Sequence, residues 1–142
     1  PLLFALNESS AATRDSFMGF RTAELIAMKE SFERNSTNCT VSTDDGSFGY
    51  HGFITEIFER AAKISKYDIV YTCGPEPMMK RVAEICSANN IKCQVSLEQR
   101  MACGIGACLV CACKAKSENG WDYKRVCKDG PVFWSDEVIW EK

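Results

Sequence analysis

The most constraining feature of this 142-residue chain is a group of cysteines near its carboxyl end. Cys103, Cys108, Cys111 and Cys127 have the spacing C-x4-C-x2-C-x15-C. A C-x4-C-x2-C run with a later fourth cysteine is the plant-type arrangement whose thiolates hold a [2Fe-2S] cluster. The small residues of segment 104–107 let the backbone wrap closely around metal and point N–H groups at sulfur. The spacing therefore predicts a cluster-binding loop.

These cysteines have two alternative uses, a zinc site and a disulfide framework. A four-cysteine zinc site normally offers two C-x2-C pairs, and Cys127 has no cysteine two or three residues away. A disulfide framework fits poorly because the cysteine total of nine is odd. Cys113 follows a predicted ligand by two residues, so it is either an alternative ligand or a core residue, and we favour the core.

The remaining cysteines favour a reducing compartment, hence the cytoplasm, if they are free thiols; they are Cys39, Cys73, Cys86 and Cys93. Composition is that of an ordinary globular protein, with 46% hydrophobic and 25% charged residues. The net charge of −2 is spread along the chain without a basic stripe, which argues against nucleic acid. We expect no membrane segment, and the first residues lack the pattern of a signal peptide.

The hydrophobic pattern of the first hundred residues alternates between strands and helices. After the end of a helix near Leu6, strands are predicted at 16–21, 39–42, 67–71 and 91–97. Helices are predicted from Thr22 to about Phe32, at 52–64, and from Pro75 or Glu76 to about Ala88. This alternation predicts an α/β fold with a doubly wound parallel sheet over residues 1–97. Residues 98–142 are predicted as a small loop-rich iron-sulfur module with short strands near 112–116 and 121–126.

A nucleotide site is expected beyond the carboxyl ends of these strands. Gly74 would allow a flat ring to approach, and Pro75 starts a helix whose amino end favours anions. The candidate residues are Gly19, Arg21, Asp44, Cys73, Gly74, Pro75, Glu76 and Met78. A plain strand-to-helix turn at 73–78 and a solvated Arg21 are the alternatives. No G-x-G-x-x-G occurs, so we expect the first strand and its phosphate loop to precede Pro1 in a longer protein.

Three segments carry a resemblance to a known family. They are T-C-G-P-E-P-M at 72–78, S-L-E-Q-R-M-A-C-G-I-G-A-C at 96–108 and C-K-D-G-P-V-F at 127–133. Together they resemble the electron-transfer subunits of dihydroorotate dehydrogenase B. That family joins an FAD-binding barrel, a ferredoxin-reductase-like NAD domain and a terminal [2Fe-2S] module. The resemblance implies that this chain corresponds to the carboxy-terminal part, with the barrel and the first NAD-domain strand absent.

The resemblance also implies a function. In the family, dihydroorotate reduces FMN in a separate catalytic subunit, and electrons pass singly through the cluster to FAD, which reduces NAD as part of pyrimidine synthesis. The family's ligands correspond to Cys103, Cys108, Cys111 and Cys127, and its nicotinamide-side motif to residues 73–78. The expected partner is the FMN-containing subunit. We expect no activity from this chain alone and assign no catalytic side chain.

Two rival functions stay open at this stage. A related flavoprotein subunit would serve a hydrogenase, a sulfide reductase or a transhydrogenase. A structural metal-binding module would bind neither iron-sulfur nor nucleotide. The aromatic residues of the module either form a partner-facing surface or pack its interior, and we favour packing; they are Trp121, Tyr123, Phe133, Trp134 and Trp140. His51 is assigned no role.

Overall fold

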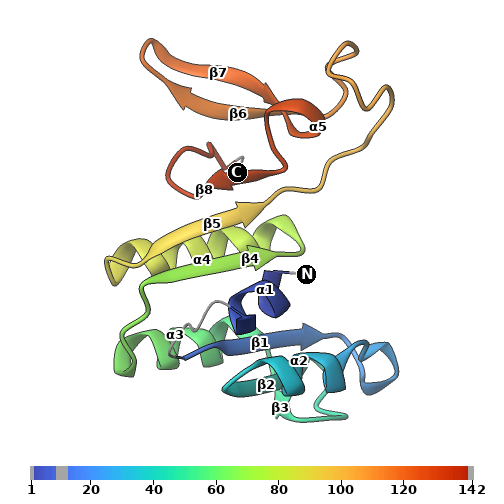
Figure 1. Cartoon of the computed structure of the whole chain (residues 1–142), viewed down its shortest axis with the longest axis vertical. Helices are drawn as coiled ribbons and strands as arrows, with labels where there is room; N and C mark the ends of the chain where they lie inside the picture. Colours follow the sequence, from blue (N-terminus) through green and yellow to red (C-terminus); the bar gives the residue numbers. More distant parts are fainter. Residues whose placement is uncertain (1, 9–12, 141–142) are drawn as a thin grey trace. The chain divides into compact units, whose positions relative to one another are not determined.

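The structure is a computed structural model that describes residues 2–8 and 13–140. It is a mixed α/β protein whose helices and strands alternate through the first hundred residues (Figure 1). The chain divides into two compact units, residues 1–58 and 59–142, and each is described by itself. None of the helices in the described ranges is both long and apolar enough to cross a membrane.

The first unit contains a three-stranded parallel sheet with strand order β1-β2-β3, formed by β1 (Asp15–Phe20), β2 (Asn38–Thr43) and β3 (Tyr50–His51). Its helical segments are α1 (Leu2–Glu8), the short 3-10 turn η1 (Ala23–Leu25), α2 (Lys29–Asn35) and the start of α3 (Ile54–Ile64). Met18, Val41 and Phe58 are buried here, and the Phe17 and Phe58 rings meet edge to face at 5.5 Å. This packing explains the apolar periodicity of both strands and of α3.

The second unit has a second sheet with strand order β4-β5-β8, from β4 (Ile69–Cys73), β5 (Lys92–Ser96) and β8 (Val132–Trp134). β4 and β5 are parallel, whereas β8 runs antiparallel to β5. Helix α4 (Glu76–Ala88) lies on this sheet and buries Met79, Val82, Ala83, Ile85 and Cys86 (Figure 1). The hairpin of β6 (Ala112–Ser117) and β7 (Gly120–Arg125) leads into the short helix α5 (Val126–Asp129).

Most predicted elements are present, and one prediction is wrong. The single helix predicted from Thr22 to about Phe32 is instead η1 followed by α2. Met28 separates them with a φ of 58°, a left-handed conformation that no continuous α-helix contains. The strands β3 and β8 and the helix α5 were not predicted, because each is too short to show a periodic pattern.

The predicted division at residue 97 differs from the division by compactness at residue 58. The reason lies in β8, which follows the cysteine-rich segment yet pairs with β5. Phe133 on β8 is buried beside Val95, its partner in the register. A separate module over 98–142 therefore remains a proposal about domain organisation, while by packing this segment belongs with residues 59–97.

Burial on α4 gives a stability prediction. Ile85 is 3% exposed, so Ile85→Ala removes buried methyl groups and leaves a cavity. We expect the free energy of unfolding to fall by about 2–5 kcal/mol. Ile64, at the end of α3, is 86% exposed, and Ile64→Ala is the matched control with an expected change within about 0.5 kcal/mol. Denaturant unfolding measures both, and equal losses in the two variants would contradict this packing.

Candidate metal centre and nucleotide-side residues

The cysteine-rich loop has a backbone shape that only a few residues adopt easily. Gly104, Gly106 and Leu109 have φ values of 68°, 82° and 61°. A Cβ on Gly106 would lie 2.8 Å from Cδ of Lys128, so a side chain there would collide as well as strain the backbone. The loop therefore turns tightly between Cys103 and Cys111.

This turning brings backbone amides to a sulfur atom. The N–H groups of Ala107 and Cys108 donate hydrogen bonds to Sγ of Cys103 at N–S distances of 3.3 and 3.4 Å. Chiefly the amide of Cys108, then that of Ile105, lowers the pKa of the Cys103 thiol to about 6. The site thus stabilises negative charge on sulfur, which thiolate ligands of iron require.

The pKa values of the four predicted ligands are linked in two pairs. The Cys108 thiol is one of the groups that lower the pKa of Cys103, and the Cys127 thiol is one of those that lower the pKa of Cys111. The backbone N–H of Cys127 is the main cause that lowers the pKa of Cys111, while the hydrogen bond to Cys111 raises that of Cys127. Within the described ranges, no three His, Cys, Asp or Glu side chains stand close enough to form a metal site by themselves. The two pairs nevertheless provide the four sulfur donors that a [2Fe-2S] cluster takes.

Burial differs between the two pairs. Cys111 is 2% exposed, and its carbonyl accepts a hydrogen bond from the N–H of Val126. Cys108 is exposed, and Cys103 and Cys127 are intermediate. Cys113 lies on β6 opposite Lys124, and burial is the main cause that raises its pKa. A thiol that burial keeps protonated fits the interpretation of Cys113 as a packing residue rather than a ligand.

An arginine that the sequence did not single out ties the loop to α5. Arg125 donates from Nε and Nη2 to the two carboxylate oxygens of Asp129, at 3.0 and 3.2 Å. Its Nη1 also donates to the carbonyl oxygen of Gly106 at 3.3 Å. The hydrogen bond from Arg125 lowers the pKa of Asp129 to about 2. Because that pKa lies below the ordinary value of 3.8, the pair stabilises the fold above about pH 4, and this contribution disappears as the pH falls towards 2.

This link gives a prediction about cluster retention. Arg125→Ala removes both the fork to Asp129 and the bond to Gly106, so we expect the cluster to be lost to a chelator about tenfold faster. Arg125→Lys keeps the positive charge but cannot donate two hydrogen bonds to the Asp129 carboxylate in the same geometry, so we expect an intermediate rate of cluster loss. Arg81→Ala, which breaks the exposed pair with Glu59, is the control. The decay of visible absorbance measures all three, and an unchanged rate in Arg125→Ala would refute this role.

The predicted nucleotide-side residues fall into two groups. In the first unit, Gly19, Arg21 and Asp44 gather at the carboxyl ends of β1 and β2. The N–H of Asp44 donates to the carbonyl of Phe20 at 3.0 Å, which joins the two strand ends. A Cβ on Gly19 would lie 2.8 Å from Cγ2 of Ile54, so this glycine permits the close approach of α3.

The second group, Cys73 to Met78, lies where β4 ends and α4 begins. Gly74 has a φ of 149°, and a Cβ there would lie 2.9 Å from Cε of Met78. Pro75 precedes α4, and its carbonyl accepts from the N–H groups of Met78 and Met79. Glu76 opens the helix. The turn from β4 into α4 is present, as both interpretations of residues 73–78 require, and the nucleotide role remains a proposal.

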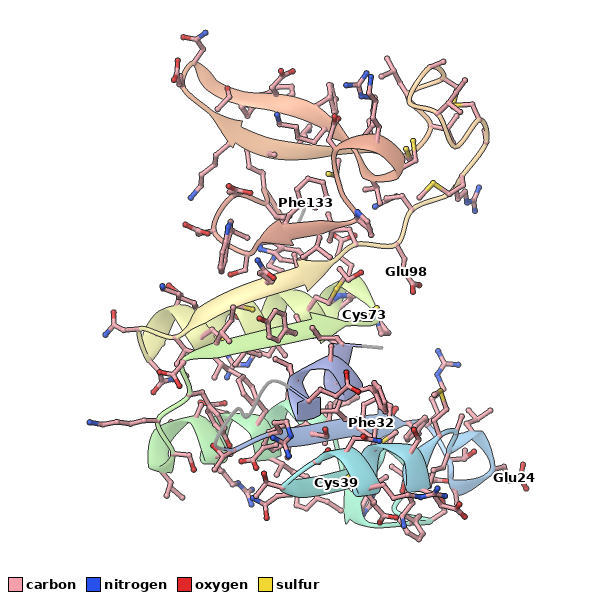
Figure 2. The ribbon with its side chains drawn as sticks, viewed as in Figure 1. Glu24, Phe32, Cys39, Cys73, Glu98 and Phe133 are labelled. Atoms are coloured by element: carbon pink, nitrogen blue, oxygen red, sulfur yellow. The ribbon has the colours of Figure 1, made fainter. Side chains whose placement is uncertain are left out.

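Glu98 joins this second group, although the sequence reasoning did not list it as a site residue. Its Oε1 accepts a hydrogen bond from Sγ of Cys73 at 3.8 Å (Figure 2). Burial, and after it the charge of Glu98, raise the pKa of the Cys73 thiol. The sequence did contain an indication of this position. Glu98 directly follows a predicted strand, and in a parallel sheet the carboxyl end of that strand lies at the same edge as the end of β4.

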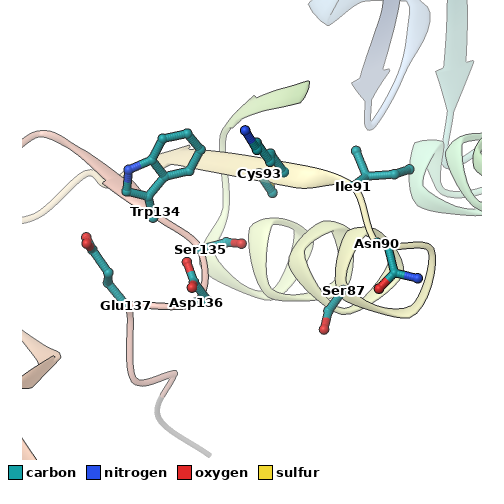
Figure 3. Close-up of a pocket in the computed structure, with 9 residues that line it drawn as sticks. Ser87, Asn90, Ile91, Cys93, Trp134, Ser135, Asp136 and Glu137 are labelled. Carbon is teal, nitrogen blue, oxygen red and sulfur yellow. The ribbon is translucent and has the colours of Figure 1, made fainter. Parts of the chain in front are cut away.

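One pocket of about 550 Å³ lies elsewhere in the second unit (Figure 3). Ser87 and Asn90 at the end of α4, Cys93 on β5, and Trp134 and Glu137 are among the residues that line it. It lies near the amino end of β5, away from the carboxyl end that carries Glu98. None of the predicted site residues is among its lining residues.

Comparison with known proteins agrees with the cysteine pattern. The iron-sulfur cluster binding domain of dihydroorotate dehydrogenase B matches residues 98–139. This match supports an iron-sulfur cofactor for the segment. The match includes all four predicted ligands and Arg125.

The similarity extends along the whole chain. The dihydroorotate dehydrogenase B (NAD(+)) electron transfer subunit of Caldanaerobacter subterraneus subsp. tengcongensis is 45% identical over 98% of this chain and 54% of the relative. That of Clostridium acetobutylicum is 38% identical over 98% of this chain and 52% of the relative. The resemblance predicted from sequence is confirmed, and the chain spans about half the length of the curated relatives it matches.

The fold of this chain is also similar to that of a solved oxidoreductase. The NADH-dependent reduced ferredoxin-NADP oxidoreductase, studied for flavin-based electron bifurcation, superposes with a TM-score of 0.80. The two chains are 29% identical, over 97% of this chain and 49% of the other. The mixed α/β arrangement with parallel sheets thus recurs in an electron-transferring oxidoreductase.

Proposed function

We propose that this chain carries electrons between an FMN-containing, dihydroorotate-oxidising subunit and NAD, by way of a [2Fe-2S] cluster and FAD. The observation that carries this proposal is the cysteine-rich loop, whose backbone amides donate hydrogen bonds to Sγ of Cys103 and which lies within the segment matched by the iron-sulfur domain family. The names of the relatives, which are electron transfer subunits of an NAD-linked dihydroorotate dehydrogenase, support the donor and acceptor.

Cys103, Cys108, Cys111 and Cys127 would hold the cluster, which transfers one electron at a time. Each iron of such a cluster takes two protein ligands, so the cluster needs all four thiols. The amides of Ala107 and Cys108 stabilise the thiolate charge of Cys103. The exposed Cys108 and the buried Cys111 give the site one side towards solvent and one towards the protein interior.

The nicotinamide side is proposed at the end of β4. Gly74 carries no side chain of its own, so only the flexible side chain of Met78 would have to move for a flat ring to approach, and Cys73 with Glu98 provides polar groups nearby. Pro75, Glu76 and Met78 shape the start of α4. Gly19, Arg21 and Asp44 would contact the remainder of the dinucleotide from the first unit's strand ends. A nicotinamide exchanges a hydride whereas the cluster exchanges single electrons, so a flavin must stand between them.

The two parallel strand pairs, β1 with β2 and β4 with β5, are proposed as parts of one doubly wound sheet in the ferredoxin-reductase-like manner. Support comes from the parallel pairing within each strand pair and from the similarity to the solved oxidoreductase over 97% of the chain. Because the solved neighbour is a ferredoxin-NADP oxidoreductase, the second candidate function for this chain is that of an NADPH-linked transhydrogenase.

Reconstitution tests the proposed function. The full protein that contains this chain would be purified anaerobically with an FMN-containing dihydroorotate oxidase subunit, and NAD reduction by dihydroorotate would be followed. We expect NADH formation that requires both subunits. NADPH oxidation coupled to ferredoxin, without any response to dihydroorotate, would instead select the second candidate.

A further inference from the structure

Two buried cysteines lie outside the metal centre, on elements of the second unit that pack together. Cys86 is 1% exposed, on the stripe of α4 that also buries Met79 and Val82, and Cys93 is 3% exposed on β5. Both are free thiols. In the described ranges no third His, Cys, Asp or Glu joins them in a metal site, which argues against a metal ion as their ligand.

The connection between α4 and β5 brings these two cysteines together. Helix α4 joins two parallel strands, so it runs back along the sheet and its last turn lies beside the start of β5. Cys86 is in that last turn, and Cys93 is the second residue of the strand. The carbonyl of Cys86 accepts a hydrogen bond from the N–H of Ile91 at 2.9 Å, so the chain turns back directly after the helix.

The two thiols also perturb each other's titration, as neighbouring groups do. The Cys93 thiol is the main cause that raises the pKa of Cys86, and the Cys86 thiol is the main cause that lowers the pKa of Cys93. The side chain of Ser135 lowers the pKa of Cys93 further. Negative charge is therefore favoured on Cys93 rather than on Cys86, and the thiolate is the form of cysteine that attacks disulfides.

The pocket of about 550 Å³ gives small molecules a route to this pair. Its described lining residues include Cys93 and Ser135 but not Cys86 (Figure 3). The charged residues of the lining are Asp136, Glu137 and Lys92. Because two carboxylates face one ammonium group, the pocket favours a small molecule with positive charge.

We propose that Cys86 and Cys93 form an oxidisable dithiol, which small disulfide molecules that enter this pocket convert into a disulfide bond between α4 and β5. The thiolate of Cys93 attacks one sulfur of the molecule R–S–S–R, forms a mixed disulfide and releases one R–S⁻. Cys86 then gives its proton to solvent, attacks Sγ of Cys93 and releases the second R–S⁻. The two cysteines lose two electrons, and each R–S⁻ takes up a proton to become R–SH.

Peptide mapping tests this proposal, because trypsin cuts after Lys92, between the two cysteines. The full protein that contains this chain, with its cluster, would be incubated without oxygen with cystamine, a small disulfide that carries two ammonium groups, and then alkylated and digested. We expect a disulfide that joins peptide 82–92 to peptide 93–100. Cys39→Ser, in the first unit, is the control and should leave this link unchanged. A link that forms only where urea unfolds the protein would overturn the proposal.

Two variants separate the roles of the sulfur atoms. Cys86→Ala should stop the reaction at the mixed disulfide, with cysteamine bound to Cys93. In Cys93→Ala, modification of Cys86 should be at least about tenfold slower, because its thiol is protonated and lies away from the pocket. Equal rates of modification at the two positions would contradict the proposed order of attack.

A change in the pocket keeps the test decisive if the buried variants do not fold. Asp136→Asn should slow the reaction with cystamine by about threefold and leave the reaction with neutral hydroxyethyl disulfide unchanged. Asp122→Asn on β7 removes the same charge outside the pocket lining and is the control for both probes. Equal slowing with both probes, or none with cystamine, would overturn the pocket as the route to Cys93.

Discussion

Serine in place of Cys103, Cys108, Cys111 or Cys127 is expected to lower iron content and visible absorbance by about tenfold or more. Each change removes one of four thiolates, and a hydroxyl at the same position is a poorer ligand for iron. The effect should be similar at all four positions, because a cluster of this type takes four thiolate ligands. Iron analysis and the visible spectrum of anaerobically purified protein measure this.

Cys113→Ser is the matched control. This thiol lies two residues from Cys111, on β6 and opposite Lys124, and burial keeps it protonated. Its replacement should leave iron content and spectrum unchanged. A loss of iron in Cys113→Ser equal to that in Cys111→Ser would show that Cys113 is a ligand and that the assignment of the four ligands is wrong.

Gly74→Val is expected to lower NAD-linked activity by at least about tenfold while the cluster spectrum stays intact. Valine would force a β-branched residue to a φ of 149° and place its Cβ against Met78. A shift of the β4–α4 turn by even 1 Å would misplace a ring bound there, which costs up to about a hundredfold in rate. NADH oxidation with a dye acceptor by the assembled oxidoreductase reports this step.

A second glycine variant separates local misplacement from general strain. Gly120 in the β6–β7 turn has a φ of 110°, but no neighbouring atom lies within 4 Å of its Cβ position. Gly120→Val should therefore introduce backbone strain while keeping NADH oxidation. If both variants lose activity equally, the end of β4 has no special part in nicotinamide binding.

Local patterns in the sequence were sufficient for the elements that depend on local physics. The spacing of the four cysteines predicted the metal loop, and the alternating pattern predicted a helix from Pro75 or Glu76 to about Ala88, where α4 lies. Thr22 to Phe32 was mistaken for one helix because apolar periodicity does not reveal the left-handed φ of Met28. Apolar periodicity indicates which residues are buried, but it does not indicate where the backbone turns.

Contacts between residues distant in sequence were not predictable in this way. The pairing of β8 with β5 joins Phe133 to Val95, and no local signal in three residues specifies that partner. The same holds for the bond from Arg125 to Gly106 and for Cys73 with Glu98, which bring separate segments together. The exposure of Trp121 was not predicted, because aromatic content alone does not distinguish a packed ring from an exposed one.

The most direct test of the account is the iron and acid-labile sulfide content of protein prepared without oxygen, together with its visible and electron paramagnetic resonance spectra. We predict two irons and two sulfides per chain, with charge-transfer absorbance and a rhombic signal after reduction. Zinc without sulfide and without visible absorbance would contradict the account, because the same four thiols would then form a structural site that carries no electrons.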